Sequence, residues 1–253
     1  MQEVIDKLKE IECDEVGMII YSTKKENKIS VYNSDITVPL ASAAKIAVGF
    51  CIAKWVEEKL FGWDDIVGDI SFNPDEDSKL IYPHFQHRKT LPLRDAVEVM
   101  IACHDSFVAN RIVQMCGGWK RVNKTIQSYF TDINILQDPF DTDNKGNLTQ
   151  ISELMILIFE GYKNNPELWT PIMNGLVRQQ GDIEGIPNHY LNHMTGGLEN
   201  VIVNIGILGD FNQNPLVYVF GANHLPNRYN NQFADEIIND AIKMLYKKHL
   251  HHK

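Results

Sequence analysis

The chain has 253 residues, of which 44% are hydrophobic, and this length is enough for a sizeable core. Thirty-three acidic residues against 24 basic ones give a net charge of −9, which argues against nucleic acid and anionic membranes as partners. No apolar run approaches the roughly 20 residues of a membrane span, and residues 1–12 are charged and amphipathic rather than a signal peptide. We therefore expect a cytoplasmic protein. The four cysteines are widely spaced and form no C-x-x-C pair, so we expect neither a metal nor another cofactor.

The first 60 residues predict a helix, a hairpin and a second, buried helix. Apolar residues recur at helical spacing in 1–12, and the runs at 16–21 and 28–32 predict two strands joined by a polar turn. From residue 42 to about residue 60 the chain is apolar on nearly every side, which is typical of a helix in the middle of a domain.

Two polar residues stand at the start of this buried helix. Ser42 is a favoured capping type, and Lys45 follows one turn later, so the two side chains can meet. A helix N-terminus and a dry environment both disfavour an ammonium, and a neutral amine beside a hydroxyl is a base beside a nucleophile. The same spacing also occurs by chance as a cap followed by a solvated lysine. The motif therefore needs partners elsewhere in the chain.

The middle of the chain is mainly helical. A polar, irregular stretch at 72–89 precedes Thr90, which we expect to cap the next helix. Helices are then predicted at 93–102, at 107–113 before the stop signal Gly117-Gly118, and at 122–130, 149–160 and 169–176.

The C-terminal part returns to strands. Residues 201–208 and 216–220 predict two of them, and 237–245 predicts an amphipathic closing helix. Strands at both ends and helices between them predict an α/β (α+β) fold: one antiparallel sheet built from the two chain ends, flanked by the terminal helices, with an all-helical lobe inserted. We expect residues 1–40 and 177–253 to form the sheet domain and 41–176 the helical domain, with the active site between them.

Three motifs occur in one order: Ser42-x-x-Lys45, His104-Asp105-Ser106, and residues 193–197, His-Met-Thr-Gly-Gly, which we expect just before a strand. In this order and context they resemble the S-x-x-K, S-D-N and K-T-G signatures of the serine β-lactamase and penicillin-binding protein family, specifically its class A branch. The run from 104 to 118 also resembles the S-D-N helix of that branch, and the resemblance covers essentially the whole chain.

The resemblance implies an acyl-enzyme mechanism. Ser42 would attack a carbonyl, Lys45 would be its base, and the backbone N–H groups of Ser42 and Gly197 would form the oxyanion hole. By the same resemblance, Ser106, Thr195, Gly196 and Gly197 are candidate substrate-binding residues.

The departures from the signatures matter as much as the matches. His104 replaces the serine of S-D-N, and it either relays a proton to the leaving group or is a helix-end residue of no catalytic value. Ser106 stands where the S-D-N signature has its asparagine. Met194 stands where the K-T-G signature has its lysine, which in the family anchors a substrate carboxylate. The loop 135–147 has aspartates but not the glutamate that activates the deacylating water in class A enzymes.

Our first hypothesis is a class A β-lactamase-like serine hydrolase that acts through a Ser42 acyl-enzyme on an ester or amide, with weak or no β-lactam turnover. The alternative is a catalytically silent binding or interaction protein with the same fold. A third hypothesis, a Cys103–His104 thiol enzyme, is disfavoured because sequence neighbours on a helix do not face one another.

Overall fold

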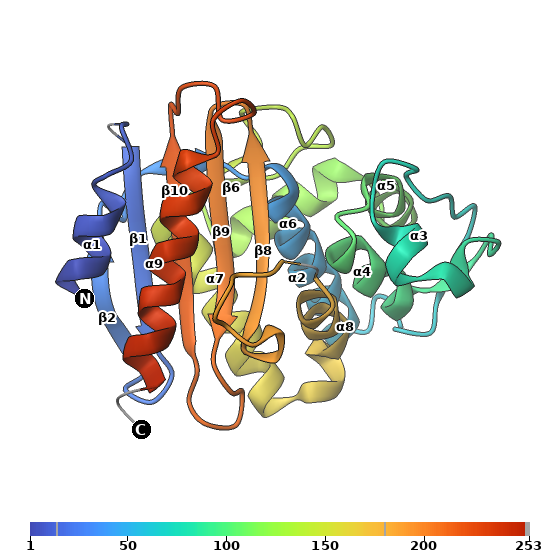
Figure 1. Ribbon diagram of the computed structural model, residues 1–253. Coiled ribbons are helices and arrows are strands. Elements are labelled where there is room, and N and C mark those ends of the chain that lie inside the picture. Colours follow the sequence, from blue (N-terminus) through green and yellow to red (C-terminus); the bar gives the residue numbers. More distant parts are fainter. Residues whose placement is uncertain (14, 180, 251–253) are drawn as a thin grey trace.

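The computed structural model describes residues 1–13, 15–179 and 181–250, and its centre is a five-stranded antiparallel sheet. The strand order is β2-β1-β10-β9-β8, so strands from the two ends of the sequence lie side by side (Figure 1). The strands are β1 (Glu15–Ser22), β2 (Asn27–Tyr32), β8 (Leu191–Leu198), β9 (Val201–Leu208) and β10 (Leu216–Asn223).

Both faces of this sheet are covered, which explains why its central strands are apolar along their whole length. Successive side chains of β10 alternate between two hydrophobic clusters: Val217 and Val219 join the core of the helical side, and Tyr218 and Phe220 join the other. The second cluster lies under α1 (Gln2–Leu8) and α9 (Phe233–Leu250), the two terminal helices in front of the sheet in Figure 1.

The opposite face supports the helical lobe, whose central element is α2 (Ala44–Glu57). Every residue of α2 from Ala44 to Ala53 is buried, as its apolar sequence predicts. None of the described helices combines the length and apolar character that a membrane span requires. Around α2 lie α4 (Leu93–Ala102), α5 (Ser106–Met115), α6 (Trp119–Tyr129), α7 (Leu148–Asn164) and α8 (Pro166–Val177), with the short α3 (Ser78–Ile81) further out.

The predicted fold class is confirmed, and apart from β8 the long strands and helices lie where the sequence pattern indicates. Several short elements were not predicted, because strands of two or three residues contain no periodicity. They are β3 (Thr37–Pro39), β4 (Ile66–Val67), β5 (Leu91–Pro92), β6 (Ile133–Asn134) and β7 (Lys145–Asn147). The expected domain boundaries stay a prediction.

Three local predictions were wrong. Ser42 does not cap α2: it lies inside the 3₁₀ turn η1 (Ala41–Ala43), and α2 has Ala43 at its N-cap position. Thr90 does not cap α4, whose N-cap residue is Pro92. The segment 193–197 does not precede a strand but lies within one, β8. Glycines are uncommon inside strands, but here they allow another part of the backbone to approach the strand closely.

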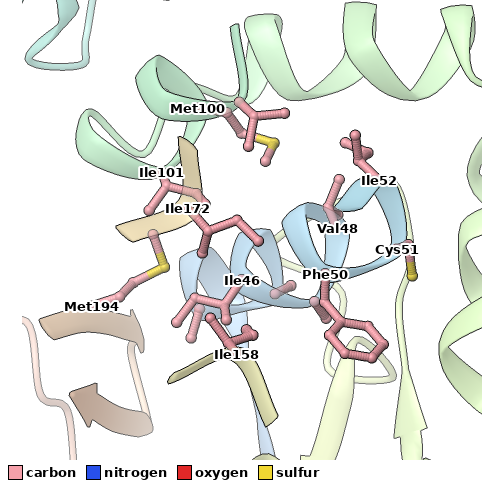
Figure 2. Close-up of a cluster of buried hydrophobic side chains, with 14 of the residues drawn as sticks. Ile46, Val48, Phe50, Cys51, Ile52, Met100, Ile101, Ile158, Ile172 and Met194 are labelled. Atoms are coloured by element: carbon pink, nitrogen blue, oxygen red, sulfur yellow. The ribbon is translucent and has the colours of Figure 1, made fainter. Parts of the chain in front are cut away.

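Met194 lies in the core of the helical lobe. Its side chain is fully buried, and Figure 2 shows it beside Ile101 of α4 and Ile172 of α8. The position that resembles the K-T-G lysine is therefore part of a dry, apolar layer.

Replacing Met194 with lysine is expected to destabilise the fold rather than restore a cation to the site. Burying an amine among isoleucines should lower the free energy of unfolding at pH 7 by about 3 kcal/mol or more. The matched Met194→Leu variant should lose less than about 1.5 kcal/mol. Urea unfolding measures both, and equal stability of the two variants would show that the position is not dry.

Candidate active site

Ser42 is held at a sharp bend between β3 and α2. Ala41, which precedes it, has a φ of 46°, an uncommon conformation for a residue with a side chain. The Leu40 N–H donates to the Asn144 carbonyl oxygen at 2.7 Å and fixes the entry to the bend. Ser42 remains partly exposed while both its neighbours are buried, so its hydroxyl is the accessible group of this turn.

Lys45 lies one turn further along, and only 5% of it is exposed. Its Nζ donates to Ser42 Oγ at 3.4 Å, so the predicted pair is in contact. Burial lowers the pKa of Lys45 to about 8, while the carboxylates of Glu76 and Asp105 act in the opposite direction. A substantial fraction of neutral amine is therefore present just above neutral pH.

The His104-Asp105-Ser106 segment is anchored by its central residue. Asp105 is fully buried and caps α5, accepting hydrogen bonds from the Phe107 and Val108 N–H groups at 3.0 Å each. Its other oxygen accepts from the Asn73 N–H at 3.1 Å. Ser106 Oγ accepts from Asn73 Nδ2 at 3.2 Å, so the loop before α3 is tied to this segment.

His104 has a φ of 55°, an uncommon conformation for a residue with a side chain. Its Nε2 lies 2.8 Å from Gln179 Oε1. Burial, followed by the charge of Lys45, lowers the pKa of His104 to about 4, so the ring is neutral at physiological pH. The structure thus brings His104 within electrostatic range of the Ser42–Lys45 pair.

Strand β8 forms the other wall of the site. The position that a Cβ on Gly196 would occupy lies 2.0 Å from the Leu40 carbonyl oxygen, so β8 approaches the Ser42 bend as closely as its backbone allows. Thr195 points to the opposite face, where its Oγ1 accepts from Asn204 Nδ2 at 3.1 Å. His193 shares that face and is buried against Asn204.

Arg228 lies over Gly197, the second glycine of β8. A Cβ on Gly197 would lie 2.3 Å from Arg228 Nη1, and that nitrogen donates to the Leu198 carbonyl oxygen at 3.4 Å. The rest of the guanidinium is held by Asp235, with bonds of 2.8 and 2.6 Å. This cation beside β8 was not predicted, because it comes from the loop before α9.

Glu76 is a second side chain that the sequence did not indicate. It is half-buried on the loop that Asn73 ties to Asp105, and its charge acts on Lys45. Burial raises the pKa of Glu76 to about 7, although the charge of Lys45 acts to lower it. An irregular loop contains no pattern from which this placement could be predicted.

A small cavity behind Lys45 has a volume of about 20 Å³, enough for one water molecule. Leu136, Gln137 and Asn144 contribute to its lining, so the loop 135–147 does reach the site. Asn144 Nδ2 is buried and has no hydrogen-bond partner among the described residues. The loop offers amides and a leucine to this cavity, and none of the described residues that line it is a carboxylate.

Cys103 does not fit a thiol mechanism. It is 1% exposed, and burial raises the pKa of its thiol well above the ordinary range. Within the described residues, no group of three or more His, Cys, Asp or Glu side chains is arranged to hold a metal ion.

The sheet, the inserted helical lobe and the site at their junction define the fold class of serine β-lactamases and penicillin-binding proteins. Residues 1–249 match the model of the β-lactamase enzyme family, and the chain belongs to this family. A sequence comparison with curated proteins gives no match.

Solved structures agree on the fold. A mutant of PBP-A, described as an acyl-enzyme complex with penicillin G, superposes with a TM-score of 0.79 at 18% identity, covering 98% of this chain and 96% of that one. A β-lactamase from Chitinophaga pinensis gives 0.79 at 14% identity, and an ancestral class A β-lactamase gives 0.78 at 15%, each covering 98% of both chains.

Gly196→Ala is expected to force β8 away from the Ser42 bend. Its Cβ would collide with a backbone oxygen, which cannot move aside as a flexible side chain can, so we expect a loss of about 3 kcal/mol in unfolding free energy. Gly68→Ala is the control, because a Cβ there meets nothing within 4 Å. Thermal unfolding compares the two, and an unchanged melting temperature for Gly196→Ala would contradict the close approach.

Proposed function

We propose that this protein is a serine hydrolase that forms an acyl-enzyme on Ser42 with a small ester or amide substrate. The observation that carries the proposal is the buried Lys45 amine, 3.4 Å from the Ser42 hydroxyl, with a pKa lowered to about 8. A lysine of ordinary pKa would have favoured the silent binding protein. A base in contact with a nucleophile that is partly exposed supports a catalytic role instead.

The reaction would begin with Lys45 taking the proton of Ser42 as Oγ forms its bond to the acyl carbon. The oxyanion would be met by the backbone N–H groups of Ser42 and of Gly197 on β8. A donor of this kind is typically worth about 3 kcal/mol of barrier. Collapse of the intermediate would break the bond to the leaving group, which takes a proton relayed from Lys45 through His104.

The proposal includes weak or no turnover of β-lactams. The cavity beside Lys45 is lined by Leu136, Gln137 and Asn144, which supply no carboxylate to activate water. In addition, the anchoring lysine of K-T-G is replaced by the buried Met194. Both observations support a substrate other than penicillin, whereas the acylation steps described above involve neither a carboxylate of the loop 135–147 nor residue 194.

The first test is covalent labelling of Ser42. The protein is incubated with a fluorophosphonate and, separately, with penicillin G, and its intact mass is measured over time. We expect a stoichiometric fluorophosphonate adduct and, with penicillin, a slowly formed adduct that persists. Both should be absent from Ser42→Ala. No adduct on the wild type with either reagent, or equal labelling of Ser42→Ala, would refute the proposal.

The second test is the pH dependence of labelling. Only the neutral Lys45 amine accepts the proton of Ser42, so the labelling rate should be low below pH 7 and should rise through a midpoint near pH 8, the lowered pKa of Lys45. Lys45→Met should lose this rise and label at least about 100-fold more slowly. Lys54→Met, on the same helix but paired with Glu57 at its outer end, should retain the wild-type profile. A flat wild-type profile would show that Lys45 is not the base.

A further inference from the structure

Gln179 links the end of α8 to the site. Its Nε2 donates to the Ile101 carbonyl oxygen in the last turn of α4, and its Oε1 lies 2.8 Å from His104 Nε2. Because the Ile101 carbonyl is an acceptor, it fixes which end of the amide carries the hydrogens. The oxygen of Gln179 must therefore face the imidazole.

This arrangement fixes the tautomer of His104. An amide oxygen can only accept, so His104 Nε2 must be the donor and must carry a hydrogen. The ring is neutral at physiological pH, because its pKa is lowered to about 4, and a neutral imidazole has one N–H group. Nδ1 is therefore unprotonated, and among the residues that the structure describes it forms no hydrogen bond.

Lys45 is the titratable side chain whose charge acts most strongly on the His104 ring. Its charge opposes protonation of His104 and acts more strongly than the other titratable neighbours, which are Asp77 and His193. Burial also lowers the pKa of His193. The Ser42–Lys45 pair thus lies within electrostatic range of a ring whose Nδ1 is an acceptor.

We propose that Gln179 is a positioning residue of this site: by accepting the hydrogen bond from His104 Nε2–H, it makes Nδ1 the nitrogen that passes the proton from Lys45 to the leaving group. The inference rests on the proposed hydrolase function. In the step, the Lys45 ammonium gives one proton to Nδ1, forming a transient imidazolium that keeps its Nε2–H. Nδ1–H then protonates the leaving oxygen or nitrogen as its bond to the acyl carbon breaks, and neutral His104 is restored.

The first experiment observes the tautomer without any substrate. Nitrogen-15 NMR of the histidine side chains at pH 7 is compared for the wild type, His104→Gln, which identifies the resonances, and Gln179→Leu. We expect a protonated Nε2 and an unprotonated Nδ1 in the wild type, and a mixture of tautomers in Gln179→Leu. A protonated Nδ1 in the wild type would overturn the proposal. This measurement is informative even if Ser42 proves unreactive, in which case the proposed function fails separately.

The second experiment measures labelling of Ser42 as a function of pH by an alkyl ester, whose leaving alkoxide requires a proton. Gln179→Leu should be slowed by about tenfold or more, within the range of general acid–base contributions. Gln179→Glu also accepts from Nε2–H, so it should recover most of the rate. Its negative charge should raise the pKa of His104 and shift the profile.

Gln86→Leu is the matched control. Gln86 is likewise a partly buried amide, but its side chain donates to the Ser78 and Tyr82 carbonyl oxygens and not to the His104 segment. It should label at the wild-type rate. If Gln179→Leu and Gln179→Glu both label as Gln86→Leu does, or if both lose the same rate with no shift in profile, Gln179 has only a structural role and the proposal is refuted.

Discussion

The burial of one amine is the constraint on which the site depends. Lys45 lies in a helix that is covered on all sides, and its pKa falls from 10.5 to about 8, which corresponds to roughly 3 kcal/mol at 1.4 kcal/mol per pKa unit. This cost is present in full below pH 8, where the folded and unfolded states are both protonated. It disappears as the pH rises to 10.5, where the unfolded state also loses its proton. The apolar helix that stabilises the lobe therefore also lowers the pKa of the amine that we propose as the base.

Sequence patterns predicted the parts of this arrangement that follow from periodicity. The apolar runs of α2, β1, β9 and β10 and the order of strands and helices were enough to predict the fold, and the spacing of Ser42 and Lys45 was enough to predict their contact. Strand β8 was not predicted, because two consecutive glycines such as Gly196 and Gly197 are more typical of loops. They occur in a strand where another backbone segment approaches closely, and that contact depends on the tertiary structure. Glu76, Gln179 and Arg228 come from loops far from the motifs, so no local pattern identifies them.

The two faces of β8 explain why the third motif could change as it did. Strand alternation directs Met194 into the helical core and Thr195 to the face with Asn204, so the two neighbours are subject to different constraints. A methionine packs in this apolar core, whereas a lysine there would bury an amine and destabilise the fold. The guanidinium of Arg228 lies over Gly197 and is already paired with Asp235. Substrates that depend on a strong carboxylate anchor would therefore gain less here than substrates held through the oxyanion hole and the backbone of β8.

Replacing a serine by His104 changes the requirements of the second motif. A hydroxyl rotates freely and can accept and donate through one atom, so it needs no partner to fix it. An imidazole has two nitrogens on different edges of a rigid ring, and only one is protonated when the ring is neutral. Such a residue relays a proton in a defined direction only if another group selects its tautomer. Gln179, 75 residues away in the sequence, makes that selection through an amide whose own orientation is set by Ile101. The proposed role of His104 at this motif position thus depends on a hydrogen bond from a residue that follows α8 in the sequence.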